Sequence, residues 1–258
     1  MAEVAIACRD LKKTFTLSRK QQKIERSPDR YKVAVNGLSF DAYEGEIFGL
    51  LGSNGAGKTT TLRIISTLIK ADAGKVAVLG KDLKENPDFV RSNIGFLTSE
   101  LKLEDYFTPN YLFDFFAELH SVPKEVAAAR KKKLFEKFGI DKFAEVKVAD
   151  LSTGMKQKIS IAIALAHDPK IIIFDEPTNG LDVITARTVT DFLKELKAEG
   201  KAIIISTHIF SLAERLCDRV GIIVEGKMKA CAPLKDLVGE STLEDVFFDI
   251  YSKEATEK

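Results

Sequence analysis

Short apolar runs alternate along the chain with longer stretches in which apolar residues recur at helical spacing. The continuous apolar runs cover residues 171–174 and 202–205, and two further strand candidates, mostly apolar, cover residues 46–51 and 219–224. The stretches with helical spacing cover residues 59–69, 154–166, 183–198 and 210–216. Continuous apolar runs are typical of strands buried on both faces of a parallel sheet, with helices between them covering those faces. The pattern therefore predicts an α/β fold with a parallel-sheet core.

The first third of the chain follows a different pattern. Residues 4–8, 33–40 and 75–79 have the composition of strands, but no helical stretch separates them. Parallel strands need crossover connections, which are usually helical, so strands without them pair antiparallel. We therefore expect an N-terminal antiparallel β layer attached to the parallel core.

A helix-rich block occupies residues 98–154, and its aromatic residues are concentrated in 106–143. These are Phe107, Phe113, Phe115, Phe116, Phe135 and Phe138, among others. Aromatics at helical spacing usually pack as core, and a surplus can present a docking face for another protein. We expect a single domain over residues 1–258, with the β layer and catalytic core in 1–97 and 155–258 and a mainly helical subdomain in 98–154.

The charge balance excludes one class of function. Lys and Arg total 39 against 38 Asp and Glu, so the 258-residue chain has a formal net charge of +1. A binder that works through bulk positive charge on nucleic acid needs a basic excess, so no nucleic-acid partner is expected. Residues 18–32 are locally polar and mostly basic. We interpret them as a solvated loop or hairpin extension; a phosphate- or membrane-facing patch is the alternative.

Cysteine usage and the lack of long apolar runs indicate the compartment. Cys8, Cys217 and Cys231 are odd in number and widely spaced, so they form neither a disulfide framework nor a paired metal motif. The N-terminus has no signal-peptide pattern, and no apolar run approaches the roughly 18 residues of a membrane-spanning helix. We expect a soluble, cytoplasmic chain that does not cross a membrane by itself.

A glycine-rich loop follows the first predicted core strand and opens a predicted helix. It consists of Gly52, Ser53, Asn54, Gly55, Ala56, Gly57, Lys58 and Thr59, followed by Thr60. Its glycines let consecutive N–H groups point at phosphate oxygens, and the helix N-terminus adds its positive dipole end. Lys58 supplies a charge to the β- and γ-phosphates, and the Thr59 hydroxyl can ligate Mg²⁺. The pattern predicts a nucleoside triphosphate site.

Two acids end a second predicted strand. Asp175 and Glu176 follow the apolar run 171–174, at the carboxyl edge of the sheet where ligands bind. Successive strand residues point to opposite faces, so the two acids have different roles. Asp175 is expected to hold Mg²⁺, and Glu176 to act as general base on the attacking water.

Three further motifs give the chain a resemblance to the ATPases of ABC transporters. Residues 151–157 (LSTGMKQ) resemble the signature sequence, residues 179–182 (NGLD) resemble the D-loop, and His208 matches the switch histidine. The resemblance implies a P-loop NTPase fold of the RecA-like type and Mg-ATP as the ligand. It also implies head-to-tail pairing with a second copy or a related ATPase subunit. Ser152 and Gly154 would then contact the γ-phosphate in trans, and His208 would hold Glu176 and the attacking water in line.

Two family positions are ambiguous or altered in this sequence. The aromatic that stacks on adenine is Phe15 if residues 18–32 are a local insertion, and Tyr31 if the insertion lies before it. The usual glutamine after the strand at 94–97 is absent, and Ser99 and Glu100 stand there instead. The resemblance therefore implies slower or differently metal-dependent hydrolysis.

Local sequence features resemble the exporter branch of the family, which includes sodium-extrusion ATPases. They are residues 45–51, the signature, and residues 242–247. The resemblance implies a separate integral membrane permease as partner and a peripheral location on the inner face of the cell membrane. Sodium efflux is the first expectation, with drug, lipid or polysaccharide export as alternatives. A soluble ABC ATPase is less favoured, because such proteins usually carry tandem cassettes or a long coiled-coil insertion.

Overall fold

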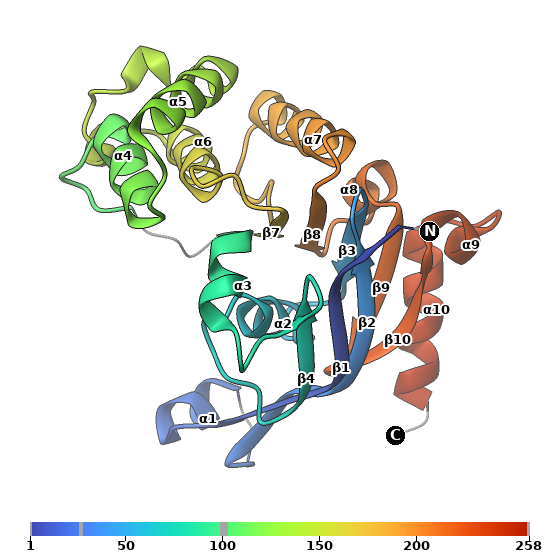
Figure 1. Cartoon of the computed structure of the whole chain (residues 1–258). Coiled ribbons are helices and arrows are strands. Elements are labelled where there is room, and N and C mark those ends of the chain that lie inside the picture. Colours follow the sequence, from blue (N-terminus) through green and yellow to red (C-terminus); the bar gives the residue numbers. More distant parts are fainter. Residues whose placement is uncertain (1, 26–27, 99–102, 257–258) are drawn as a thin grey trace.

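A computed structural model describes residues 2–25, 28–98 and 103–256 and contains two sheets (Figure 1). The larger sheet has six strands in the order β10-β9-β3-β8-β7-β6. Neighbouring strands are parallel except for β10, which pairs antiparallel with β9 at one edge. The strands are β3 (Ile47–Leu51), β6 (Ile94–Leu97), β7 (Ile171–Asp175), β8 (Ala202–Thr207), β9 (Arg219–Val224) and β10 (Lys227–Pro233). The expected parallel core is confirmed.

The central strands are buried on both faces because they separate two hydrophobic cores. Every residue of β3, β7 and β8 is buried. Ile172 and Phe174 pack into one core, whereas Ile171 and Ile173 pack into the other. This alternation is the two-residue period of an extended strand, and it explains why these runs are continuously apolar.

The smaller sheet is the expected antiparallel layer, with strand order β2-β1-β4-β5. Its strands are β1 (Val4–Thr16), β2 (Tyr31–Tyr43), β4 (Ala73–Val78) and β5 (Lys81–Asp82). β1 and β2 extend well beyond the predicted runs and form a long hairpin. Its connection contains a short helix, α1 (Arg19–Glu25). The hairpin-extension interpretation of residues 18–32 is therefore confirmed, although the helix was not predicted.

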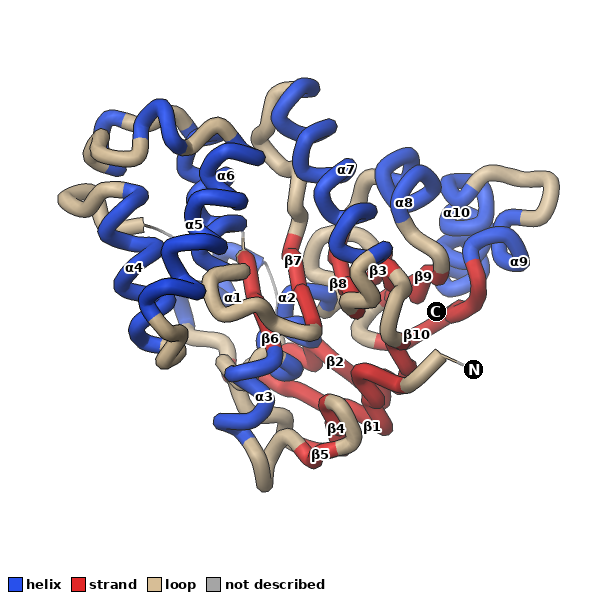
Figure 2. The backbone as a smooth tube through the Cα atoms, turned by 45° about the horizontal axis from the view of Figure 1, so that its top comes forward, coloured by secondary structure: helices blue, strands red, loops and turns tan. Residues whose placement is uncertain are grey.

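Helices α2 (Lys58–Ile65) and α3 (Pro87–Asn93) pack between the two sheets, where Leu62, Ile65 and Val90 are buried in the shared core. The other face of the large sheet is covered by α6 (Thr153–Ala164), α7 (Val183–Ala198) and α8 (Phe210–Leu216) (Figure 2). The chain ends in α9 (Leu234–Val238) and α10 (Leu243–Thr256). We had not predicted β10, α9 or α10. Helix α2 ends earlier than predicted, and Thr67 just beyond it has a positive φ of 63°.

The helical block contains α4 (Pro109–Leu119), α5 (Lys124–Phe138) and two short 3-10 turns, Asp141–Phe143 and Val148–Asp150. It lies beside α6, away from the antiparallel sheet (Figures 1 and 2). Phe113, Phe135 and Phe138 are buried, and Phe113 meets Phe135 edge to face at 5.7 Å. Phe107 and Phe115 remain exposed. The block thus contains both the core aromatics and the surplus that the sequence predicted.

Among the described residues, no helix is both long enough and apolar enough to cross a lipid bilayer.

Candidate functional site

The glycine-rich loop joins the carboxyl end of β3 to the first residue of α2. Gly57 has a φ of 106°, and a Cβ there would lie 2.3 Å from the Ala34 carbonyl oxygen. At Gly52 a Cβ would lie 2.4 Å from the Ile223 carbonyl oxygen. Neither position can accept a side chain without moving backbone, so these glycines allow the loop to curl closely between β2 and β9. The curl leaves the α2 N-terminus open for an anion.

Lys58 is a buried cation at the centre of this loop. Its Nζ donates to the carbonyl oxygens of Gly52, at 2.7 Å, and Ser53, at 3.2 Å. The same Nζ lies 3.9 Å from Glu176 Oε1. Burial lowers the pKa of Lys58, and the nearby carboxylates of Glu176 and Asp175 oppose that shift. A buried ammonium group with this environment is suited to receiving phosphate oxygens.

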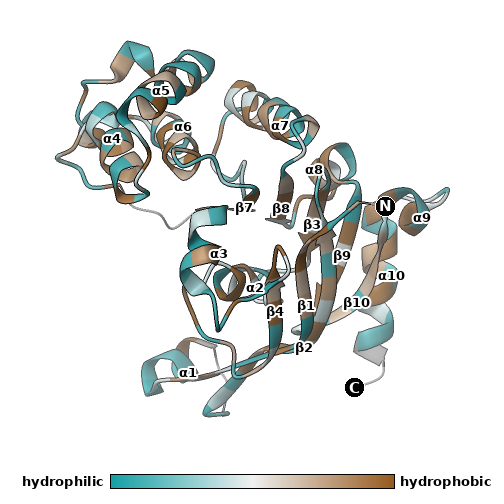
Figure 3. Cartoon of the chain, in the orientation of Figure 1, coloured by the Kyte–Doolittle hydropathy of each residue, from teal (hydrophilic) through white to brown (hydrophobic). Residues whose placement is uncertain are grey.

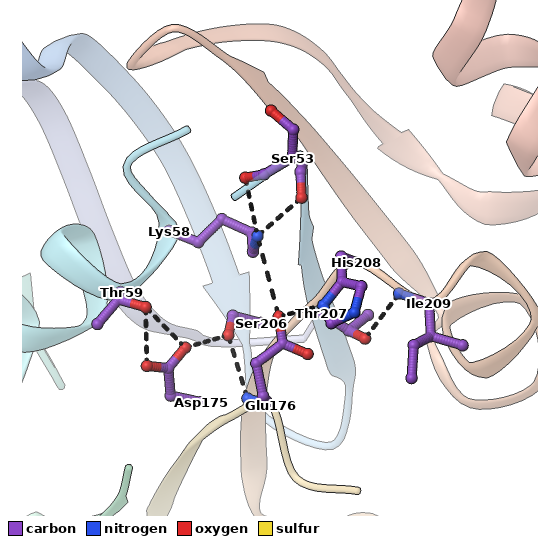
Figure 4. A network of polar contacts seen from close by, with 10 residues as sticks. Ser53, Lys58, Thr59, Asp175, Glu176, Ser206, Thr207, His208 and Ile209 are labelled. Atoms are coloured by element: carbon purple, nitrogen blue, oxygen red, sulfur yellow. Dashed lines mark hydrogen bonds and ion pairs between the residues drawn. The ribbon is translucent and has the colours of Figure 1, made fainter. Parts of the chain in front are cut away.

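Thr59 and Asp175 meet at the first turn of α2. The Thr59 hydroxyl lies 2.8 Å from Asp175 Oδ2 and 3.1 Å from Oδ1. Ser206, near the end of β8, donates its hydroxyl to Asp175 Oδ1. Figure 4 shows this chain of contacts, which brings together β7, β8 and α2. Because both acceptor oxygens are held in place, the Asp175 carboxylate is fixed toward the phosphate loop.

Glu176 follows the last residue of β7 and, as predicted, contacts other groups than Asp175 does, but its positive φ of 54° and not strand alternation sets its direction. Its Oε1 lies 2.9 Å from His208 Nδ1, and its backbone N–H donates to the carbonyl and hydroxyl oxygens of Ser206. His208 sits in the turn after β8, which the Thr207 hydroxyl stabilises by accepting from Ile209 N–H at 3.0 Å. The Glu176 carboxylate thus lies between Lys58 and His208 (Figure 4).

One cleft of about 560 Å³ connects these groups. Its lining includes the loop from Asn54 to Thr60, both acids, Asn179 and His208. Phe15, at the end of β1, lines the same cleft, whereas Tyr31 lines a neighbouring cavity instead. The described positions therefore favour Phe15 over Tyr31 as the aromatic near a bound base.

Sequence reasoning missed Ser206, Gln21 and Lys32 as site residues. Ser206 lies in the Ser-Thr-His segment that carries His208, so a polar residue beside the strand-end acids was the available signal. Gln21 and Lys32 come from the long β1–β2 hairpin and also line the cleft. Nothing in their local sequence links them to a phosphate loop, because the hairpin register brings them there. Ser99 and Glu100 lie outside the described residues.

The signature residues lie apart from this cleft. Ser152 is the N-cap of α6, where its hydroxyl accepts from Met155 N–H at 3.3 Å. Gly154 lies beside the start of α7, with the polar atoms of Asp182 and Thr185 just under 4 Å from its Cβ position. Among the described residues, the lining of the cleft includes neither Ser152 nor Gly154. One chain therefore does not bring its own signature onto its own phosphate loop.

The donor set fits magnesium and a triphosphate. A threonine hydroxyl and a carboxylate are the hard oxygen ligands that Mg²⁺ prefers, with phosphate oxygens and water completing its shell. The described residues contain no cluster of three or more His, Cys, Asp or Glu side chains suited to a tightly caged metal. Mg²⁺ is usually bound through few carboxylates plus substrate phosphates, and the Thr59 hydroxyl beside Asp175 fits that donor pattern.

In this chain β3 runs through a glycine loop into α2, which begins with a lysine and a threonine, and two acids follow at the end of β7, separated from β3 by β8. This arrangement defines a P-loop nucleoside triphosphatase. The chain belongs to the ABC transporter family, whose model matches residues 35–179, more than half of the sequence. It is thus an ABC-type ATPase and the ATP-binding subunit of a transporter.

Similar proteins extend this assignment over nearly the whole chain. The ABC transporter ATP-binding protein NatA of Bacillus subtilis (strain 168) is 38% identical, and the match covers 88% of this chain and 94% of that protein. A Nod factor export ATP-binding protein I of Burkholderia lata is 39% identical over 76% of this chain and 64% of its own length. A dimeric bacterial ABC transporter cassette superposes with a TM-score of 0.78 at 26% identity, covering 88% of this chain and 98% of the cassette.

Proposed function

We propose that this chain is the ATPase subunit of an exporter and hydrolyses Mg-ATP where two such chains meet head to tail. The convergence of Lys58, Asp175 and Glu176 in one cleft carries the proposal. Because the signature residues lie outside that cleft, a second chain must supply them to complete the site. The similarity to a dimeric cassette supports this arrangement.

The side chains of the cleft divide the chemistry between them. Lys58, now bonded to the Gly52 and Ser53 carbonyl oxygens, would exchange them for β- and γ-phosphate oxygens. Glu176 would accept a proton from the water that attacks the γ-phosphate, and His208 would hold the Glu176 carboxylate in line. Ser152 and Gly154 N–H of the second chain would bind the γ-phosphate at the start of α6.

Thr59 and Asp175 would hold Mg²⁺, directly or through water, beside the β- and γ-phosphates. When bound, the ion supplies charge neutralisation for the transferred phosphoryl group. The contact between the Thr59 hydroxyl and Asp175 keeps both ligands at one point of the cleft. Ser206 is then a positioning residue, because it orients the Asp175 carboxylate without reaching the nucleotide loop.

Steady-state ATP hydrolysis by a Glu176→Gln variant tests the proposal. The substitution keeps the shape of the side chain but removes its basicity, so we expect turnover to fall at least about a hundredfold while ATP binding persists. Glu240→Gln, at an exposed position outside the cleft, is the matched control and is expected to turn over at the parent rate. Parent-like hydrolysis by Glu176→Gln would overturn the general-base assignment.

A separate membrane permease is the second partner we propose. Tyr111, Phe115 and Leu119 of α4 are exposed and repeat every fourth residue, and Phe107, just before the helix, continues the same spacing. We call these four residues the α4 stripe. The rings of Phe107 and Tyr111 stack at 4.5 Å, and those of Tyr111 and Phe115 at 6.2 Å. An ordered apolar stripe of this kind is suited to a helix presented by another protein. We propose that a cytoplasmic helix of the permease docks on it.

Co-expression and co-purification with a membrane permease from the same genome test the docking site. Tyr111→Asp combined with Phe115→Asp places charge on the stripe, so we expect loss of the permease with nucleotide binding unchanged. Ile24→Asp on α1, another exposed apolar position, is the control and should retain the permease. A complex that survives both stripe substitutions would refute docking at α4.

For the cargo we propose sodium ions, on the sequence resemblance of residues 45–51 and 242–247 to the sodium-extruding branch. One relative is named for Nod factor export instead, so drug, lipid and polysaccharide cargo stay as alternatives. ATPase activity of the reconstituted complex, measured with sodium replaced by potassium, tests the choice. We expect stimulation by sodium alone; equal rates with both ions would exclude sodium as the cargo.

A further inference from the structure

An apolar pocket lies beside the phosphate loop and has no role in the chemistry above. It has a volume of about 340 Å³ and is lined by Leu51, Gly52, Ser53, Asn54, His208, Phe210, Phe247, Phe248 and Tyr251. We call it the aromatic pocket. Its outer wall comes from α10, whose apolar positions appear brown in Figure 3. The pocket shares Asn54 and His208 with the nucleotide cleft. A protein that covers the aromatic pocket therefore also reaches the edge of the cleft.

The aromatic wall is ordered and partly uncovered. Phe210 of α8 lies 5.2 Å from Phe247 and 6.3 Å from Phe248, measured between ring centroids. Phe247 is buried, but Phe248 and Tyr251 are 52% and 46% exposed. Ordered aromatic rings beside a pocket form a preformed binding surface. Their exposure to water does not stabilise the isolated chain, so it indicates a contact with another protein.

The most exposed aliphatic side chains among the described residues lie elsewhere, at the start of α7. Val183 and Ile184 are 85% and 79% exposed. They are held rigidly, because the carboxylate of Asp182 accepts from the backbone N–H groups of Ile184 and Thr185 and from the Thr185 hydroxyl. A capped helix start that presents two β-branched residues to solvent is suited to insertion into a pocket.

This pair is attached to the signature region. Asp182 and Thr185 flank Val183 and Ile184 in sequence, and both lie just under 4 Å from the Cβ position of Gly154. If Gly154 of one chain faces the phosphate loop of a second chain, Val183 and Ile184 of the first chain must lie close to that loop. The aromatic pocket begins at Gly52 to Asn54, on the rim of the same loop.

We propose that Val183 and Ile184 of one copy insert into the aromatic pocket of a second copy of this chain when ATP closes the dimer. This inference rests on the proposed head-to-tail pairing and adds a contact that is apolar and independent of nucleotide chemistry. By two-fold symmetry the contact forms twice per dimer. We assign the pocket's occupant to a second copy of this chain because the chain carries both the Val183–Ile184 pair and the aromatic pocket. The contact would therefore favour self-association over pairing with a subunit that lacks α10.

Cysteine cross-linking tests the contact. The background carries Cys231→Ser, since Cys231 is the exposed native cysteine, and Glu176→Gln to retain ATP. Chains with Ile184→Cys are mixed with chains carrying Tyr251→Cys, with Mg-ATP and a mild oxidant. We expect a disulfide-linked mixed dimer only in the mixture and only with ATP. Leu119→Cys mixed with Tyr251→Cys is the matched control, because Leu119 is also exposed but lies on α4.

Sedimentation of untagged chains provides the second measurement. In the Glu176→Gln background, combined truncation by Val183→Ala and Ile184→Ala should weaken ATP-dependent dimerisation at least about tenfold, because the buried methyl groups are lost. ATP affinity of the monomer should not change. Leu68→Ala, at an exposed position outside the pocket and the cleft, should dimerise as the background does.

The outcomes separate this inference from the function on which it rests. A normal ATP-dependent dimer without the mixed cross-link, or unweakened by the truncations, overturns the aromatic-pocket contact and leaves the proposed function standing. A chain that shows no ATP-dependent dimer even with Glu176→Gln contradicts both.

Discussion

At the scale of single residues, the backbone of Glu176 explains how two neighbouring acids act on different groups. Its φ of 54° is in the left-handed region, which costs a non-glycine residue roughly 1–2 kcal/mol. The two hydrogen bonds from its N–H to Ser206 hold that conformation. As a result the chain leaves the strand direction at Glu176, and its carboxylate reaches Lys58 and His208. Strain at this position is thus tied to the site rather than to the core.

Phe15 lines the nucleotide cleft and is the aromatic residue expected to stack on the base. A base that stacks on an aromatic ring gains about 1–3 kcal/mol, so Phe15→Ala should weaken ATP affinity by about tenfold or more. Triphosphate contacts are untouched, so binding of inorganic triphosphate should not change. Equilibrium binding of fluorescent ATP and competition by triphosphate measure both quantities.

Tyr31→Ala is the matched control for Phe15. The two residues lie near each other at the end of the β1–β2 hairpin beside its connecting segment, where Phe15 pairs with Lys32 and Thr16 pairs with Tyr31. Tyr31 lines the neighbouring cavity instead of the cleft, so its truncation should leave ATP affinity as in the parent. A larger loss of affinity for Tyr31→Ala than for Phe15→Ala would reverse the assignment.

The candidate site could be predicted residue by residue wherever chain spacing fixes it. Lys58 and Thr59 follow the glycine loop directly, and Asp175 and Glu176 end a strand that is evident from its apolar run. The choice between Phe15 and Tyr31 could not be made from sequence, because it depends on hairpin register. The role of Ser206 likewise depends on which strands are neighbours in the sheet.

At the scale of elements, a pair of stacked histidines joins the end of α4 to the turn after α6. The rings of His120 and His167 lie 3.8 Å apart and are nearly parallel. His167 Nε2 bonds to the Ile94 carbonyl oxygen at 3.2 Å, whereas its buried Nδ1 has no partner. Burial lowers the pKa of His167 to about 4, and His120 and Arg130 act in the same direction while Asp168 opposes them. Burial and the adjacent His120 therefore favour a neutral His167, whereas the hydrogen bond to the Ile94 carbonyl oxygen opposes the lowering of its pKa.

The His167 shift predicts how stability depends on pH. Between pH 6.5 and about 4 the unfolded chain binds a proton at this residue that the native chain does not, so stability falls as pH falls. Because His167 is partly exposed, solvent screening reduces the effect, and we expect the free energy of unfolding to fall by about 1–2 kcal/mol. This is equivalent to a decrease in Tm of about 2–6 °C. Thermal unfolding of the parent and of His167→Gln at pH 7.5 and 5 measures it.

Glutamine can keep the donor to Ile94 but does not titrate, so the difference between the two pH values should shrink in His167→Gln. The parent chain, measured at the same two pH values, is the reference. An unchanged response in His167→Gln would rule out the histidine pair as its source.

The elements divide into those that the sequence pattern could predict and those it could not. β3, β7 and β8 are buried on both faces, and this burial leaves an unambiguous apolar run. β10 is an edge strand with intermediate and exposed residues, so it has no such run. Helix α1 is polar and short, and its position depends on the hairpin that carries it.

At the scale of the whole molecule, the helical block is joined to the core by two kinds of contact. Lys137 on α5 pairs with Glu195 on α7 across a groove of about 730 Å³, and Lys133 pairs with Glu199 at 3.6 Å. Exposed pairs of this kind contribute little to stability. Phe138 packs edge to face on Phe192, with the ring centroids 4.9 Å apart, and such a buried aromatic contact contributes more to the attachment than an exposed ion pair does. The groove lies away from the nucleotide cleft.

The separation of the signature from the phosphate loop is the feature of the whole molecule on which the proposed pairing of two chains rests. Lys58→Ala disables the loop of its own chain, and Gly154→Asp disables the signature by placing a negative charge where the γ-phosphate would bind. The space at Gly154 admits a Cβ without a close contact, and aspartate in the first turn of α6 favours the helix. Both variants are therefore expected to fold.

ATP turnover by a mixture of these two variants tests the head-to-tail account most directly. Each variant alone should be inactive, since every site in its dimers lacks one half. In an equal mixture, mixed dimers contain one complete site, so activity should recover to about a quarter of the parent value if subunits pair at random. A mixture no more active than either variant alone, or full activity of Gly154→Asp by itself, would contradict the account.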